Sequence, residues 1–261
     1  MKYLKKSLGQ NFLTDKNIIK KIINSVNVYN KNVIEIGPGN GALTDEIIKK
    51  NPKSITVIEK DNHLANNLKE KYSNSKYFKI FNQDILKLDI EKLKLKHSII
   101  FGNLPYNISS QILIKFLKLK NWPPNFSDLI FMFQKELGDK IIGSYPSSNY
   151  GRLSIITGYR LSVIKKFLVS SNCFFPKPKV KSMVIHFKPK LNKNFKIKQI
   201  KNLEKITNII ISNKRKMINK SIKKILNERK IKKISELNLN LRPEKISPKI
   251  FYKITELYEK N

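Results

Sequence analysis

Residues 32–50 read NVIEIGPGNGALTDEIIKK, and this stretch decides the fold. A short apolar run ends at Gly37, and an amphipathic segment begins near Gly41. Such a run bounded by glycine is typical of a buried strand, and the apolar spacing after it is typical of a helix. Glycines between the two let a ligand approach the backbone at the helix N-terminus. The stretch therefore predicts a strand–turn–helix unit with a ligand site at its turn.

The same alternation continues on both sides of this unit. A helix is predicted at residues 14–26, where isoleucines recur on one helical face, with Thr14 or Asp15 as its N-cap. Beyond the unit, strands are predicted at 54–61, 77–85, 97–103 and from 128 onward, with helices at 63–72 and 108–119. This order predicts an α/β fold in which helices cover both faces of a parallel sheet. Two last strands, 162–170 and 181–189, have no helix between them and predict a hairpin-like sheet edge.

The C-terminal part of the chain has a different pattern. The strands stop after about residue 188, and residues 201–230 and 243–260 have helical patterns. Residues 188–261 hold 22 basic and 6 acidic residues, a net charge of +16. We therefore predict a domain boundary near residue 188, with a first domain over residues 1–187 and a small, basic, all-helical domain over residues 188–261.

The whole chain of 261 residues has a formal net charge of +34, which makes a polyanion the natural partner. Of the 53 basic residues 48 are lysine, and isoleucine and asparagine are also abundant. An A/T-rich genome inflates all three residue types without any selection for binding. Nucleic acid is the favoured partner, with compositional bias supplying part of the charge.

Other features indicate a cytoplasmic protein. The single cysteine, Cys173, excludes an internal disulfide and suits a reducing compartment. No apolar run approaches the roughly 20 residues that span a bilayer, and the start lacks the apolar centre of a signal peptide. The three histidines lack metal-ligand spacing, so no metal is expected: His63, His97 and His186.

Acidic residues at the ends of two predicted strands join the glycines in a ligand site. Glu59 follows Gly37 by 22 residues, where an acidic residue typically bonds a ribose hydroxyl. Asp84 ends the next strand region on the same sheet edge. Together these residues predict a pocket for an adenosine-containing ligand. Because Gly37, Gly39 and Ala42 also fit the dinucleotide pattern, a nicotinamide enzyme and a methyltransferase both remain open here.

The stretch FGNLPYNISS, residues 101–110, favours methyl transfer. The methyl group of S-adenosylmethionine is already activated, so a protein must mainly orient the nucleophile. The side-chain oxygen of Asn103 and a carbonyl near Leu104 can accept hydrogen bonds from an adenine amino group and aim its lone pair. Pro105 stiffens the turn, and Tyr106 offers a ring on which an extruded base can stack.

The chain resembles the small-subunit ribosomal RNA adenine dimethyltransferases, the kasugamycin-resistance methyltransferases. The resemblance is carried, in family order, by KKSLGQNFLTD, VIEIGPGNGALT, VIEKD, NQDIL, FGNLPYNIS, MFQKE, YGRLSI, FFPKPKVKS, NKRKMINKSI and LRPEKIS. It implies a Rossmann-like S-adenosylmethionine-dependent methyltransferase, with a catalytic domain over residues 1–187 and a helical C-terminal domain over residues 188–261 that binds RNA. The implied reaction is dimethylation of N6 of two adjacent adenosines in the 3′-terminal hairpin of small-subunit (16S) rRNA during 30S biogenesis.

The resemblance also implies roles for individual residues. In this pattern Glu59 holds the ribose, Asp84 bonds the adenine, and Glu35 sits where a carboxylate can meet the cofactor's ammonium group. The implied cofactor-binding residues are Asn11, Leu13, Glu35, Gly37, Gly39, Glu59, Asp84 and Asn103. The implied catalytic residues are Asn103, Leu104, Pro105, Tyr106 and Phe174, with Phe174 stacking on the target base opposite Tyr106.

The RNA-binding face departs from the family in one respect. Such proteins have an arginine-rich segment in the tail, whereas NKRKMINKSI is mostly lysine. Lysine keeps the charge but loses the bidentate fork for phosphate. The residues expected to bind RNA are Lys135, Arg152, Lys214, Arg215, Lys216 and Lys220. The expected partner is small-subunit rRNA, either naked or in an assembling 30S subunit, met by a monomeric protein with no membrane association.

Three other functions remain open as alternatives. The first is a relative that methylates large-subunit RNA and confers macrolide resistance, against which LRPEKIS and FFPKPKVKS argue by resemblance. The second is a non-catalytic RNA-binding assembly factor, against which the intact Asn103–Tyr106 segment weighs. The third is a nicotinamide oxidoreductase, which has no use for a charge of +34 and for which the sequence offers no acid–base set.

Overall fold

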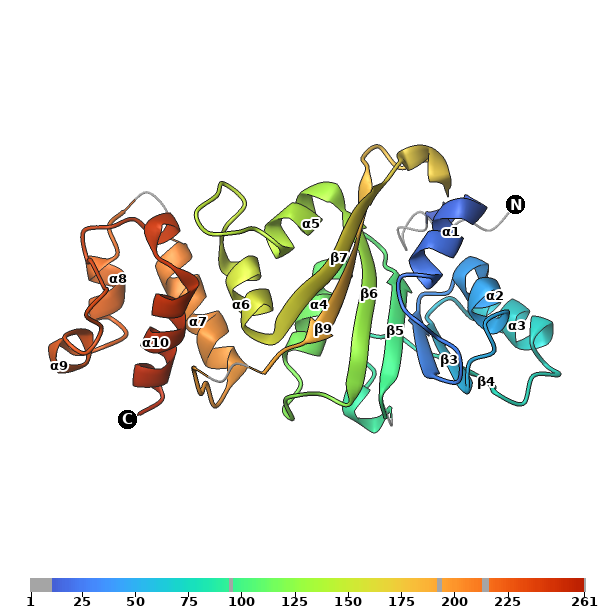
Figure 1. Cartoon of the computed structure of the whole chain (residues 1–261), viewed down its shortest axis with the longest axis horizontal. Coiled ribbons are helices and arrows are strands. Elements are labelled where there is room, and N and C mark those ends of the chain that lie inside the picture. Colours follow the sequence, from blue (N-terminus) through green and yellow to red (C-terminus); the bar gives the residue numbers. More distant parts are fainter. Residues whose placement is uncertain (1–10, 94–95, 192–193, 213–215, 261) are drawn as a thin grey trace. The chain divides into compact units, whose positions relative to one another are not determined.

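The computed structural model describes residues 11–93, 96–191, 194–212 and 216–260. The chain divides into two compact units (Figure 1). The first combines residues Met1–Gly138 with Ser162–Pro189, and the second combines Asp139–Leu161 with Lys190–Asn261. We expected one boundary near residue 188. The chain in fact enters the second unit twice, because residues 139–161 have their partners there.

A seven-stranded sheet forms the centre of the first unit, in the order β4-β3-β2-β5-β6-β9-β7. The strands are β2 (Asn32–Ile36), β3 (Ser54–Glu59), β4 (Phe78–Asn82), β5 (Ser98–Asn103), β6 (Phe126–Gln134), β7 (Leu161–Val169) and β9 (Ser182–Pro189). The pairs among β2 to β6 are parallel, and β9 runs antiparallel to β6. The α/β sheet is therefore confirmed, and the two last strands are neighbours at its edge.

The strands that the glycine-bounded pattern predicted are buried. Ile55, Val57 and Phe101 have no exposed surface, as expected for parallel strands covered on both faces. Parallel pairing places the carboxyl ends of β2, β3, β4 and β5 along one sheet edge. Loops at this edge of an open parallel sheet are where ligands bind.

The helices of the first unit are α1 (Lys16–Ile23), α2 (Ala42–Ile48), α3 (Asn62–Lys71), α4 (Ser109–Leu117) and α5 (Lys135–Ile141), the last of which runs into the second unit. Two of them have aspartate caps, of which only that of α1 was expected. The Asp15 carboxylate accepts from the N–H groups of Asn17 and Ile18, and the Asp61 carboxylate does the same at the start of α3. Each cap satisfies backbone donors that would otherwise lack partners.

A two-stranded antiparallel ladder adds a feature that the sequence did not suggest. Strand β1 (Phe12–Leu13) pairs with β8 (Phe174–Phe175), so that Phe12 lies opposite Phe175 and Leu13 opposite Phe174. The hydroxyl and N–H of Thr14 also bond to the Cys173 carbonyl, at 3.1 and 2.8 Å. Segments about 160 residues apart in the chain, QNFL and FFP, are thereby held together.

His186, for which no role was expected, lies in the core. Its Nε2 is 2.6 Å from the Asp128 carboxylate, and both residues are 4% exposed. Burial acts to raise the pKa of Asp128, but its hydrogen bonds with His186 and Ser127 outweigh burial and lower it. The pair joins β6 to β9 near the amino end of β6. It therefore lies at the other end of the strands from their carboxyl ends, where ligands bind.

The second unit is helical, as the pattern after residue 188 predicted. Its elements are α6 (Arg152–Arg160), α7 (Ile200–Ile211), α8 (Asn219–Lys223), α9 (Glu228–Ile231), η4 (Pro243–Lys245) and α10 (Pro248–Tyr258). Residues 139–161 belong here because α6 lies against α7 and α10. Two tyrosines join residues 139–161 to the C-terminal segment of this unit. The Tyr150 hydroxyl donates to the Ile246 carbonyl at 2.8 Å, and the Tyr252 hydroxyl donates to the Ile155 carbonyl at 3.0 Å.

The helical pattern of residues 201–230 forms several separate helices. A new helix begins after Asn227, because its side chain accepts from the Lys230 N–H and caps the new start. The Ile218 N–H also bonds to the Leu241 carbonyl at 3.0 Å, which fixes the start of α8 against a distant segment. Among the helices within the described residues, none has both the length and the apolar character needed to cross a membrane.

Candidate active site

A cavity opens at the carboxyl ends of β2 to β5, with a volume of about 1120 Å³ including its open mouth. It is lined by residues from the loops after these strands and from β1. Every residue expected to bind the cofactor lines it: Asn11, Leu13, Glu35, Gly37, Gly39, Glu59, Asp84 and Asn103. Leu104, Pro105 and Tyr106 line it too. The structure thus brings together segments that are far apart in the sequence.

The glycine turn is shaped by backbone conformation and by close contacts. Gly37 and Gly39 have φ angles of +66° and +58°, a region that side-chain-bearing residues rarely adopt. A Cβ atom added to Gly39 would lie 2.8 Å from the ring of Phe12, so the loop and β1 meet only because position 39 has no side chain. The Gly39 N–H donates to Glu59 Oε2 at 3.1 Å. The turn is therefore held open against one wall of the cavity.

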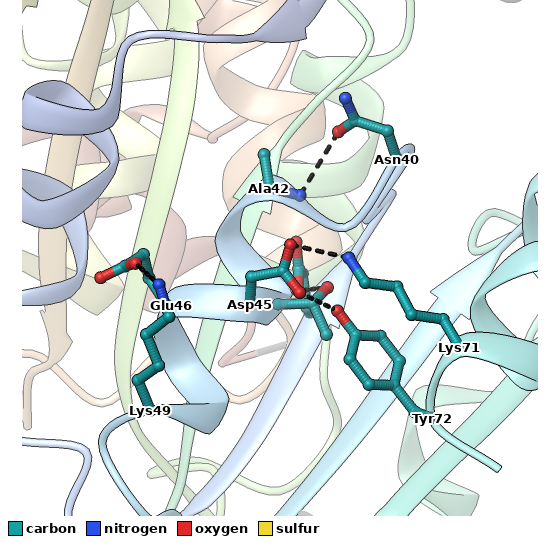
Figure 2. Close-up of polar contacts among 9 residues, drawn as sticks. Asn40, Ala42, Asp45, Glu46, Lys49, Lys71 and Tyr72 are labelled. Carbon is teal, nitrogen blue, oxygen red and sulfur yellow. Dashed lines mark hydrogen bonds and ion pairs between the residues drawn. The ribbon is translucent and has the colours of Figure 1, made fainter.

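A second set of contacts anchors the helix that follows this turn. Figure 2 shows Lys71 and Tyr72, at the end of α3, both directed at the Asp45 carboxylate of α2. The Lys71 ammonium is 2.7 Å from Asp45 Oδ2, and the Tyr72 hydroxyl donates to Oδ1. A Cβ on Gly41, with φ of +85°, would lie 2.9 Å from Leu68, so α2 starts in close contact with α3. These contacts fix the helix N-terminus at the cavity.

Glu35 is an almost fully buried carboxyl group in the cavity wall, with 1% of its surface exposed. Burial raises its pKa to about 8, against a hydrogen bond from the Thr44 hydroxyl (2.6 Å) that lowers it. The nearby Glu59 and Asp45 carboxylates raise it further. The site therefore has an excess of buried acid, which a cationic ligand group would relieve.

Glu35→Gln should remove a pH dependence of stability. Because the folded-state pKa of Glu35 is about 8 against an ordinary 4.5, its contribution is full below pH 4.5 and is lost as pH rises through 8. The free energy of unfolding of the ligand-free wild type should thus fall by up to about 1.4 kcal/mol per pH unit in this range. Urea denaturation at pH 5 to 8 measures this slope. The matched surface change Glu70→Gln should keep the wild-type slope, and an unchanged slope in Glu35→Gln would contradict the assignment.

Asp84 and Lys60 form the wall on the β3 and β4 side. The Lys60 ammonium is 2.9 Å from Asp84 Oδ2, and Asp84 Oδ1 accepts from the Leu86 N–H at 2.9 Å. Partial burial acts to raise the pKa of Asp84, but the bonds from Lys60 and Leu86 outweigh it and lower the pKa. Asp84 is therefore an ionised acceptor in the cavity. Lys60 was not among the expected residues, and its position two residues before the α3 start gave no signal for a role.

Asn103 has a fixed side-chain orientation. Its Nδ2 donates to the Asn11 carbonyl at 3.1 Å. This bond uses the donor end of the amide, so Oδ1 is the end that can accept from a ligand. Asn11 thus contributes its backbone to the site, a role that the QNFL motif alone does not reveal.

Tyr106 is positioned by a residue that sequence reasoning missed. Its hydroxyl is 2.6 Å from the hydroxyl of Ser182, the last residue of the F-x-P-x-P-x-V-x-S stretch, which has no exposed surface. Burial raises the pKa of Tyr106, against the hydrogen bond with Ser182. Phe174, expected to stack opposite Tyr106, is 4% exposed and packs in the hydrophobic core, and it is not among the described residues that line the cavity. Its stacking role stays a prediction.

The residues expected to bind RNA are spread over the two units. Lys135 begins α5 in the first unit, and Lys216 and Lys220 are exposed in the second. The Arg152 guanidinium donates to Glu204 and Asn208 of α7 at 3.0 and 3.1 Å, so this residue has a structural role in joining α6 to α7. Lys214 and Arg215 lie outside the described residues.

Comparison with known proteins agrees with this geometry. A family model described as ribosomal RNA adenine dimethylase matches residues 1–260. A protein from Pelagibacter ubique named Ribosomal RNA small subunit methyltransferase A is 44% identical over 256 residues, covering 98% of this chain and 97% of the relative. A protein of the same name from Mycoplasma mobile is 40% identical over 263 residues, covering 98% of each chain.

Two solved structures show the same fold. A dimethyladenosine transferase from Plasmodium falciparum superposes with a TM-score of 0.77 at 23% identity, covering 93% of this chain and 95% of that one. The 23S rRNA methyltransferase ErmE superposes with a TM-score of 0.71 at 22% identity, covering 95% of this chain and 100% of that one. At these identities the likeness is one of architecture, a Rossmann-like methyltransferase sheet with a helical C-terminal region.

Proposed function

The chain belongs to the ribosomal RNA adenine dimethylase family, and we propose that it dimethylates N6 of two adjacent adenosines in the 3′-terminal hairpin of small-subunit rRNA during 30S assembly. It is an S-adenosylmethionine-dependent rRNA methyltransferase. The observation that carries the proposal is the cavity that gathers the glycine turn, the acidic residues and the Asn103–Tyr106 segment. The names of relatives at 40–44% identity support the small subunit as the source of the RNA.

The cavity fits S-adenosylmethionine by its shape and its charge. Gly37 and Gly39 leave open backbone at the start of α2, and a cationic group such as the ammonium of the methionine part would stabilise the ionised form of the buried Glu35 carboxyl. Glu59 would hold the ribose and the ionised Asp84 would bond the adenine amino group. Asn11, Leu13 and Asn103 close the remaining wall. When bound, this cofactor supplies a methyl group on a cationic sulfur.

The protein's own part is to hold the target base. Asn103 Oδ1 would accept from the adenine amino group, since its amide nitrogen is held by Asn11. The Leu104 carbonyl would accept the second N–H, which favours a pyramidal nitrogen with its lone pair directed into the cavity. Pro105 restricts the turn, and Tyr106, held through Ser182, would present its ring to the base. Phe174 would have to turn out of the core to stack on the other face.

The alternatives can be weighed against the structure. An RNA-binding factor without catalysis has no need of a cavity that joins a glycine turn, buried carboxylates and an oriented amide, which favours an active enzyme. An oxidoreductase is excluded by the family. The large-subunit reaction is performed by ErmE, whose identity to this chain is 22% against 40–44% for the small-subunit relatives. We therefore favour the small subunit as the source of the RNA. We further propose that the protein acts in the cytoplasm as a monomer.

Incubation with labelled S-adenosylmethionine and unmethylated small subunits tests the proposal. We expect label in the 3′-terminal hairpin, mapped by primer extension to two adjacent adenosines. Naked small-subunit RNA and unmethylated large subunits are the comparison substrates. Label on the large subunit alone, or none, would overturn the proposal.

The basic C-terminal segment, residues 188–261, is proposed to bind and position RNA without forming the active site. Changing Lys214, Arg215, Lys216 and Lys220 to glutamine should weaken RNA binding several-fold. The slope of log K against log salt should fall by about 0.7–0.9 for each phosphate that no longer meets a cation, because fewer counterions are released. Binding of S-adenosylhomocysteine, measured by calorimetry, should persist. An unaltered salt slope would assign the tail another role.

A further inference from the structure

A basic strip, residues 175–181 with the sequence FPKPKVK, lies outside every role assigned so far. Phe175 is 46% exposed, more than any other phenylalanine that the structure describes. Lys177, Lys179 and Lys181 are all exposed and recur at every second residue. Within the part of the chain that the structure describes, no carboxylate pairs with these three ammonium groups. The strip therefore presents an aromatic ring followed by three unneutralised charges.

The charge around the strip is not balanced by the sequence either. No aspartate or glutamate occurs between Asp139 and Glu204, whereas residues 161–203 hold 11 lysines. A solvated lysine face usually carries interspersed acids, as in the helices of the first unit, where Asp45 meets Lys71 and Glu46 meets Lys49 (Figure 2). A run of one sign on a surface is the electrostatic feature that attracts a polyanion.

Both ends of the strip contact residues that line the cavity. At its start, Phe175 lies opposite Phe12 in the β1–β8 ladder, so the two rings share a face, and Phe12 lines the cavity beside Gly39. At its end, the Ser182 hydroxyl meets the Tyr106 hydroxyl at 2.6 Å. The Lys181 carbonyl also accepts from the Lys135 N–H at 2.9 Å. The strip is thus held along the edge of the site where the target base is expected.

We propose that the basic strip is the track for the single-stranded RNA that flanks the target adenosine. Its aromatic ring stacks on a neighbouring base, and its three lysines meet consecutive phosphates. This combination of a stacking platform with a basic groove is how proteins hold single strands without reading their sequence. The inference rests on the proposed function, and it names the element that keeps the neighbouring nucleotides in place while one adenosine occupies the cavity.

Charge variants test the lysines. The strip variant changes Lys177, Lys179 and Lys181 to glutamine. The control variant makes the same change at three lysines that are exposed near the amino ends of β2 and β3, namely Lys31, Lys50 and Lys53. Both lose three charges, but the control lysines lie at the opposite sheet edge from the cavity. The strip variant should lower the slope of log K against log salt for unmethylated small-subunit RNA by about 2, while the control stays near the wild type. Equal slopes in the two variants would overturn the proposal.

Aromatic variants test Phe175. Phe175→Leu keeps bulk but loses the stacking face, so KM for RNA should rise roughly tenfold with kcat unchanged. Phe175→Trp should restore the wild-type KM, and Tyr29→Leu, at a distant exposed aromatic, should have no effect. Unchanged KM in Phe175→Leu contradicts stacking. Binding of S-adenosylhomocysteine verifies the fold of each variant; if Phe175→Leu fails there, the lysine variants decide.

The proposed function and the strip give separable outcomes. Methylation of small subunits by the wild type reports on the function alone, whereas the difference in RNA affinity between strip and control variants reports on the strip alone. A wild type that binds RNA through the strip but methylates nothing would overturn the function and support the track. A wild type that methylates while strip and control variants bind alike would do the reverse.

Discussion

Asn103→Ala should lower the single-turnover rate of RNA methylation by roughly 10²–10³ while leaving the fold intact. The amide is oriented before any ligand arrives, because its Nδ2 is held by the Asn11 carbonyl at 3.1 Å. Its oxygen is therefore preorganised to accept from the target amino group, and preorganised polar groups account for rate losses of this size when removed. The measurement is rapid-quench methylation at saturating RNA and S-adenosylmethionine.

Two further variants separate the effect of Asn103 from weaker binding. Asn103→Asp keeps an acceptor but adds a negative charge beside the cationic sulfur, which stabilises the ground state more than a transition state in which that charge disperses. It should not restore the rate. Tyr106→Ala should mainly weaken base capture, by about 1–3 kcal/mol of lost stacking, and so raise KM. A wild-type single-turnover rate in Asn103→Ala would show that the amide is only a turn residue.

The features that follow from local sequence were predictable. The apolar run that ends at Gly37 predicted β2 and the turn, and Asp15 predicted the cap of α1. The acidic residues at the ends of β3 and β4 predicted the cavity wall, because parallel strands bring their carboxyl ends to one edge. These inferences need only periodicity and neighbouring residues.

Features that depend on distant pairing could not be predicted from local pattern. The Tyr106–Ser182 hydrogen bond joins residues 76 positions apart, and the Asn103–Asn11 bond spans 92. The pKa of Glu35 depends on how completely the fold buries it, which composition does not state. In the sequence, residues 139–161 continue the sheet unit without a break. Their place in the second unit depends on hydrogen bonds from the Tyr150 and Tyr252 hydroxyls that join them to the C-terminal segment.

Glu59→Ala should weaken binding of S-adenosylhomocysteine by roughly 10- to 100-fold, the loss expected for charge-assisted bonds to two ribose hydroxyls. Glu59 is 7% exposed and ends β3 at the cavity. Burial raises its pKa, against bonds from the Asp61 and Gly39 N–H groups. Calorimetry of wild type and variant measures the loss, and binding within twofold of the wild type would remove Glu59 from the cofactor site.

The same residue also holds the glycine turn, since Glu59 Oε2 accepts from the Gly39 N–H at 3.1 Å and Oε1 from the Asp61 N–H at 2.8 Å. A loss in Glu59→Ala could therefore come from a displaced loop and not from the ribose. S-adenosylhomocysteine that lacks the ribose 2′-hydroxyl separates the two causes. If Glu59 binds the ribose, the wild type discriminates against the deoxy ligand and Glu59→Ala does not, because the hydroxyl has then already lost its acceptor. If Glu59 acts only on the loop, both proteins discriminate equally, since the ribose contact lies elsewhere. Glu59→Gln should resemble Glu59→Ala in this comparison, because its amide nitrogen would face one of the two backbone N–H donors that the carboxylate now satisfies.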